Sequence, residues 1–131
     1  MTSQEKLNKK TSNGQHICVG LDTDINKIPE HLKKFQNPVL EFNKIIIENT
    51  AKDVAAFKIN FAFYERNGLE GLRNLEKTIE LIPDDVLIIG DAKRGDIGNT
   101  SQMYAESMFK HFNMDASTLN PYMGIDSVGP F

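Results

Sequence analysis

The sequence predicts an α/β protein built on a parallel β-sheet, and three features carry this prediction. Short apolar runs that suit buried strands alternate with stretches in which apolar residues recur every three or four positions, as on one face of a helix. The predicted strands begin roughly 30 to 38 residues apart, which is about the length of one βα unit. Each apolar run also leads directly into polar or ionisable residues, which parallel βα folds gather at the carboxyl ends of their strands.

Four strands are expected, at about residues 17–22, 54–60, 86–91 and 115–120. The third contains Val86-Leu87-Ile88-Ile89-Gly90, an aliphatic run typical of a strand buried on both faces. The polar residues that follow the four strands are, in order, Asp22, Lys58 with Asn60, Asp91 with Lys93, and Asn120.

Helices are expected between the strands, over about residues 38–51, 69–82 and 99–112. The second shows the clearest apolar stripe, with glutamate and lysine on its other face. The third opens with Asn99-Thr100-Ser101, residue types that suit a helix N-cap. Residues 2–12 are expected to form a short amphipathic helix or a flexible arm, and another helix is expected to start near Ile125.

Composition narrows the class of protein. The 131 residues include 15 basic and 18 acidic side chains, a net charge of −3, which disfavours general nucleic-acid binding. No apolar run approaches the roughly 20 residues that a membrane span needs, and the polar first residues do not resemble a secretory signal. The single cysteine, Cys18, is expected as a buried thiol in a reducing, cytoplasmic compartment. We expect one domain at this length.

The chemistry is concentrated at the strand ends. Asp91 and Lys93 are two residues apart on one strand and should share a face, beside Lys58 from the neighbouring strand. With Asp96 from the following loop they would form an alternating set of charges, with Asp22 at its rim. Two like charges about 4 Å apart cost about 4 kcal/mol at an effective dielectric constant of 20, so the alternation stabilises such a cluster. Because buried charges are costly, this concentration indicates a chemical role.

The remaining ionisable residues point to structural roles. Arg94 should alternate to the opposite face of its strand and form a salt bridge on the helix side. No catalytic role is assigned to His16, His31 or His111, which lie near loops or helix ends. The sequence lacks paired cysteine or cysteine–histidine spacings, so no structural metal site is expected.

The pattern Asp91-x-Lys93-x-x-Asp96-Ile97 after a hydrophobic strand resembles the signature of the orotidine 5′-phosphate decarboxylase family. The longer form, residues 91–100, is similar to the longer bacterial subgroup of that family. Resemblance extends from about residue 16 to residue 131, and matching segments stand at the other three strand ends. They are Val19-Gly20-Leu21-Asp22, Phe57-Lys58-Ile59-Asn60 and Asn120-Pro121-Tyr122-Met123-Gly124-Ile125-Asp126-Ser127.

This resemblance implies a parallel (β/α)8 TIM barrel of which the chain holds about the first four βα units. It implies decarboxylation of orotidine 5′-monophosphate to uridine 5′-monophosphate, in de novo pyrimidine biosynthesis, without cofactor or metal. Lys93 would donate the proton to C6 of the pyrimidine, and Asp91 would sit against the substrate carboxylate. Lys58 would hold Asp91 and a ribose hydroxyl, and Asp22 would bind the ribose.

The resemblance also implies a homodimer, in which Asp96 and Thr100 reach the neighbouring active site. Asn60, Ile97 and Asn120 would complete the substrate contacts on this chain. A fixed ammonium beside C6 would stabilise the carbanion left by loss of CO2 and then protonate it.

The chain departs from the family pattern in having only four of eight strands. The family's second half supplies contacts to the pyrimidine and phosphate, so we expect a partial chain that is inactive alone. One alternative is a magnesium-dependent sugar-phosphate decarboxylase or hexulose-phosphate synthase, in which an acidic residue would be expected where this sequence has Lys58. The other is a half-barrel interaction module that pairs through its open sheet edges.

Overall fold

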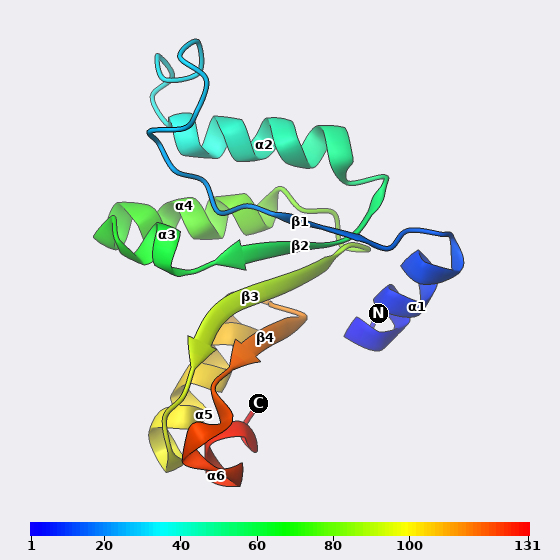
Figure 1. Ribbon diagram of the computed structural model, residues 1–131, viewed down its shortest axis with the longest axis vertical. Helices are drawn as coiled ribbons and strands as arrows, with labels where there is room; N and C mark the ends of the chain where they lie inside the picture. Colours follow the sequence, from blue (N-terminus) through cyan, green and yellow to red (C-terminus); the bar gives the residue numbers. More distant parts are fainter.

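The computed structural model, which describes all of residues 1–131, contains a single parallel sheet of four strands paired in the order β1-β2-β3-β4 (Figure 1). The strands are β1 (Ile17–Gly20), β2 (Val54–Asn60), β3 (Leu87–Arg94) and β4 (Ala116–Leu119). The helices are α1 (Ser3–Ser12), α2 (Pro38–Thr50), α3 (Ala62–Glu65), α4 (Gly68–Glu80), α5 (Gly98–Glu106) and α6 (Ile125–Val128). Two shorter helical segments are the π-helical η1 (Ser107–His111) and the 3₁₀-helical η2 (Pro121–Met123).

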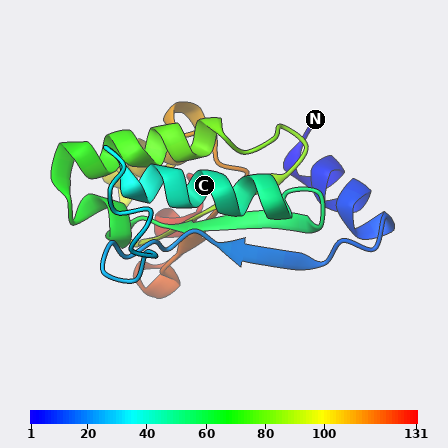
Figure 2. The ribbon, with the colours of Figure 1, turned by 90° about the horizontal axis from the view of Figure 1, so that it is seen from above.

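Each strand pairs with its neighbour in sequence, and this order has a geometric consequence. Right-handed crossovers between successive parallel strands place the connecting helices on the same face of the sheet. Figure 2 shows α2 and α4 lying over the same face of β1 and β2. The predicted parallel α/β architecture of four βα units is therefore confirmed, with the singly wound order of a barrel rather than the reversing order of a doubly wound sheet.

Most predicted boundaries lie close to the observed ones. Strand β2 has the predicted bounds, β1 and β4 are shorter, and β3 continues beyond Asp91 to Arg94. The helix predicted over residues 99–112 is divided between α5 and the π-helical turn η1. Of the two alternatives for residues 2–12, the helix is present as α1, where Thr2 and Glu5 form a reciprocal capping box.

One apolar core lies between the sheet and the helices. Phe57 and Ile59 of β2 point into it, together with Ile47 of α2 and Leu75 of α4, and all four are essentially inaccessible to solvent. Gly90 interrupts the aliphatic run of β3 because a Cβ atom there would lie 3.3 Å from side-chain atoms of Met108 and Met114.

The sheet face that the helices do not cover carries the polar residues at the strand ends. The prediction that Cys18 is buried in the core is wrong, because Cys18 lies on this face and is exposed. Val19 packs against the core, so its neighbour Cys18 alternates to the face that α2 and α4 do not cover. None of the helices is long and apolar enough to cross a lipid bilayer.

Candidate active site

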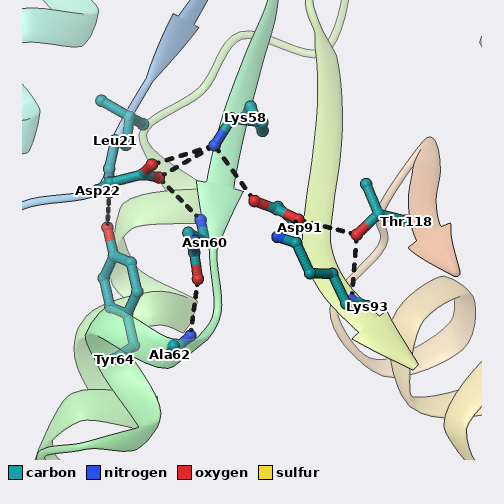
Figure 3. Close-up of polar contacts among 9 residues, drawn as sticks. All are labelled: Leu21, Asp22, Lys58, Asn60, Ala62, Tyr64, Asp91, Lys93 and Thr118. Atoms are coloured by element: carbon teal, nitrogen blue, oxygen red, sulfur yellow. Dashed lines mark hydrogen bonds and ion pairs between the residues drawn. The ribbon is translucent and has the colours of Figure 1, made fainter. Parts of the chain in front are cut away.

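Four charged side chains meet at the carboxyl ends of the strands, and we refer to Asp22, Lys58, Asp91 and Lys93 as the charge quartet (Figure 3). The strand register explains why they meet. Gly20 pairs with Lys58, and Asn60 pairs with Asp91, so the ends of β1 and β2 lie beside the part of β3 that carries Asp91. The prediction that Lys58, Asp91 and Lys93 gather at the strand ends with Asp22 beside them is confirmed. Asp96, which the sequence predicted as a further member of this set of charges, is not part of it within the chain.

Lys58 lies between two carboxylates. Its Nζ is 3.1 Å from Asp22 Oδ2 and 3.4 Å from Asp91 Oδ2. Burial opposes the charge on this lysine, but the hydrogen bond and charge of Asp22, aided by Asp91, outweigh it and raise the Lys58 pKa. Lys58 is therefore a fixed cation that joins β1 to β3.

Asp91 is the most buried member of the charge quartet, with a side chain only 10% exposed. Lys93 Nζ donates to Asp91 Oδ1 at 2.5 Å, and the hydroxyl of Thr118 donates to the same oxygen at 2.9 Å. These hydrogen bonds, that of Lys93 first, outweigh burial and hold the Asp91 pKa below its usual value, helped by the charge of Lys58. Asp91 is therefore ionised at neutral pH.

Lys93 reaches Asp91 from an unusual backbone conformation. Its φ angle is +50°, in the left-handed region that a residue with a side chain seldom adopts. The simple two-residue alternation of a strand therefore does not describe this position, although the predicted contact with Asp91 is present. The Lys93 side chain is 68% exposed, so its ammonium is open to a bound molecule.

A buried polar network supports the segment around Asp22. The Tyr64 hydroxyl donates to the carbonyl of Leu21 at 2.8 Å and accepts from Asn43 Nδ2 at 2.9 Å. Asn43 also donates to Thr78 Oγ1 at 2.9 Å, and all three side chains are buried. Burial raises the pKa of Tyr64 to about 12, so the phenol stays a neutral hydrogen-bond donor.

The Asp22 carboxylate has its own backbone donor. Its Oδ1 accepts from the backbone N–H of Asn60 at 3.0 Å, while the Asn60 side chain accepts from the N–H of Ala62 at 3.0 Å. Asn60 thus connects the end of β2 both to the charge quartet and to the start of α3.

The other predicted site residues do not join the charge quartet. Asp96 accepts a hydrogen bond from the N–H of Ile97 at 2.8 Å and forms no ion pair within the chain. Ile97 is 47% exposed at the start of α5, and Thr100 is exposed in its first turn. Asn120 follows β4 and its side chain accepts from the N–H of Tyr122 at 3.0 Å.

Two predictions about the remaining ionisable groups can be compared with the structure. Arg94 forms the predicted helix-side salt bridge, with 2.7 Å between Nη2 and Oε1 of Glu65 on α3. His111 contacts Glu76 on the helix side of the molecule, away from the charge quartet.

No three of the His, Cys, Asp and Glu side chains gather closely enough to hold a metal ion.

Thr118 is a site residue that the sequence reasoning missed. It contacts both Asp91 and the backbone of Lys93, whereas the sequence predicts only Asn120 as a site residue near this strand end. No local signal in the sequence marked Thr118, because its contacts depend on the register of β4 against β3.

Comparison with known proteins adds an independent result. A family model described as orotidine 5′-phosphate decarboxylase / HUMPS family matches residues 15–131. The orotidine 5′-phosphate decarboxylase of Porphyromonas gingivalis is 53% identical over 134 aligned positions, which cover 100% of this chain and 49% of that protein. The Flavobacterium johnsoniae enzyme of the same name is 47% identical, with the same coverage. The chain thus spans about half the length of the curated relatives it matches.

Solved structures agree with the sequence matches. The structure of Leishmania donovani OMP decarboxylase superposes with a TM-score of 0.87 and 38% identity, covering 100% of this chain and 49% of that one. The structure of Leishmania donovani UMP synthase superposes with a TM-score of 0.89 and 40% identity, covering 100% of this chain and 27% of that one. Both similarities include the whole of the sheet that carries the charge quartet.

Proposed function

Because the chain belongs to the orotidine 5′-phosphate decarboxylase / HUMPS family, we propose that it carries the charged half of an active site that converts orotidine 5′-monophosphate to uridine 5′-monophosphate. This reaction belongs to de novo pyrimidine biosynthesis. The observation that supports the proposal most is the charge quartet, in which a buried, ionised Asp91 lies between two ammonium groups. Such a fixed arrangement suits a reaction in which charge moves without any cofactor.

The proposed reaction breaks the bond between C6 of the pyrimidine and the carboxylate carbon. CO2 leaves, and the electron pair stays on C6, where the ring delocalises it poorly. The exposed ammonium of Lys93 stabilises that pair and transfers its proton to C6, after which water restores the lysine proton. Asp91 faces the departing carboxylate and keeps the ammonium in place.

The other residues of the site have supporting roles in this proposal. Lys58 neutralises Asp91 and, with Asp22, binds ribose hydroxyls; its partial exposure of 33% leaves hydrogen-bonding capacity for a sugar. Asn60, Ile97 and Asn120 provide further substrate contacts. Asp96 and Thr100 reach the site of a second copy in a cytoplasmic homodimer, consistent with their position outside the charge quartet of their own chain.

The magnesium-dependent alternative is less well supported. Carboxylates that hold a divalent cation need the position between them to be free for the metal. Here the Lys58 ammonium occupies the position between Asp22 and Asp91. The relatives that match at 47–53% identity also carry the decarboxylase name.

The test is a spectrophotometric assay for loss of orotidine 5′-monophosphate. It is run on this 131-residue chain and on the protein made from the same reading frame carried to its natural stop codon. We expect turnover to uridine 5′-monophosphate by the longer protein and none by the chain alone, because half of each relative lies outside the match. Absence of turnover by the longer protein would overturn the proposal, and a folded, inactive dimer of the chain would then favour the interaction module.

A further inference from the structure

Asp91 and Lys93 lie in an irregular part of β3. Gly90 pairs with Ser117, and the next pair along the two strands joins Arg94 to Leu119. Four steps along β3 therefore face two steps along β4, so β3 bulges over residues 91–93. A bulge redirects side chains and leaves backbone groups without their ladder partners.

Thr118 is the residue of β4 that faces this bulge. Its hydroxyl oxygen accepts a hydrogen bond from the Lys93 N–H at 3.0 Å and donates one to Asp91 Oδ1 at 2.9 Å (Figure 3). A hydroxyl can do both at once. The Thr118 hydroxyl therefore replaces the β4 carbonyl that would accept the Lys93 N–H in a regular sheet. It also connects the backbone of Lys93 to the side chain of Asp91.

The backbone at Lys93 needs such support. A φ of +50° is unfavourable for lysine, and conformations of this kind persist only where the surroundings fix them. The residue after it is anchored independently. The Asn120 N–H donates to the Arg94 carbonyl at 2.7 Å, and the Arg94 guanidinium is paired with Glu65. The N–H of Lys93 itself donates to the Thr118 hydroxyl.

We propose that Thr118 is a positioning residue of the active site, whose hydroxyl fixes the left-handed backbone of Lys93 together with the carboxylate of Asp91 and so aims the ammonium before substrate binds. This inference rests on the proposed decarboxylase function for its kinetic consequences. Threonine fits the position because its branched side chain suits a strand and its hydroxyl hydrogen-bonds the two bulge residues Lys93 and Asp91.

Three variants separate this role from a general effect on the fold. Thr118→Val keeps the shape of the side chain and removes the hydroxyl, whereas Thr118→Ser keeps the hydroxyl. Ser117→Ala is the matched control, because Ser117 is the preceding residue on β4 and its buried hydroxyl has no hydrogen-bond partner. If Thr118→Val fails to fold, Thr118→Ala replaces it.

In the longer protein we expect Thr118→Val to lower kcat by about 10- to 100-fold with a smaller change in KM, since it removes a hydrogen bond to a charged group. The acid limb of its pH profile should move to higher pH, because Thr118 is one of the groups that lower the Asp91 pKa. Thr118→Ser should restore most of kcat, and Ser117→Ala should match wild type.

A second readout does not depend on activity. Hydrogen exchange of the Lys93 amide in the 131-residue chain should be slow in wild type and Thr118→Ser, and fast in Thr118→Val. Unchanged exchange in Thr118→Val, or unchanged kcat, would overturn the positioning role. If wild type does not turn over orotidine 5′-monophosphate, the proposed function fails, and the exchange measurement alone then decides the role of Thr118.

Discussion

The Lys58 ammonium on β2 lies 3.4 Å from the Asp91 carboxylate on the adjacent strand β3, and each group has a second partner of opposite charge. Lys58 also contacts Asp22, and Asp91 also contacts Lys93. Charges thus alternate in sign along the row Asp22, Lys58, Asp91, Lys93, which stabilises four charged groups in a small space. Removing the buried Asp91 carboxylate would leave the ammonium groups of Lys58 and Lys93 without the negative charge between them.

The first prediction concerns Asp91 and pH. The pKa of Asp91 is lower in the folded chain than in the unfolded one. The ionised carboxylate therefore contributes fully to the free energy of unfolding above about pH 4, and this contribution is lost as the pH falls toward the lowered pKa. We expect Asp91→Asn to be less stable than wild type by about 1–3 kcal/mol at pH 7, with a difference that shrinks at lower pH.

Urea unfolding of the chain between pH 2 and pH 7, about the range in which carboxylates titrate, measures this difference. Asp84→Asn is the control, because Asp84 is exposed and has no ion pair. A stability difference for Asp91→Asn that stays constant with pH would contradict the assignment.

The second prediction concerns the buried network behind Asp22. Tyr64→Phe removes the hydroxyl that donates to the Leu21 carbonyl and accepts from Asn43, so the Leu21 carbonyl loses this donor and the Asn43 amide keeps only its other contacts. We expect a loss of about 1–3 kcal/mol in the free energy of unfolding. Tyr122→Phe, at a residue that is 89% exposed, should change stability little. Equal effects from the two variants would show that the network does not stabilise this region.

The third prediction concerns metal dependence. If Lys58 takes the place between the carboxylates that a cation would need, excess EDTA should leave decarboxylation by the longer protein unchanged. The measurement is turnover before and after dialysis against EDTA. Loss of activity that added Mg²⁺ restores would instead support the magnesium-dependent alternative.

Much of this architecture could be predicted because the apolar pattern of each segment agrees with the place that the segment takes in the folded chain. The short aliphatic run 86–89 favours a buried strand, and parallel βα units gather their strand ends at one edge. That rule alone was enough to bring Asp22, Lys58, Asp91 and Lys93 together.

The parts that could not be predicted depend on pairing between distant residues. The bulge in β3 arises from its register with β4, so neither the left-handed Lys93 nor the contribution of Thr118 is visible in the local sequence. Cys18 lies in an apolar run, but its exposure depends on which sheet face the helices cover. Asp96 and Thr100 stay as predictions, because their proposed partners lie on a second chain.

The most direct test of the central claim is the rate of orotidine 5′-monophosphate decarboxylation by the longer protein carrying Lys93→Ala. Lys110→Ala is the control, since Lys110 is a similarly exposed lysine paired with Glu106 on the helix side. We predict a loss of at least about 1000-fold in kcat/KM for Lys93→Ala, with little change in unfolding temperature, and wild-type behaviour for Lys110→Ala. Substantial turnover by Lys93→Ala would contradict the assignment of Lys93 as the proton donor.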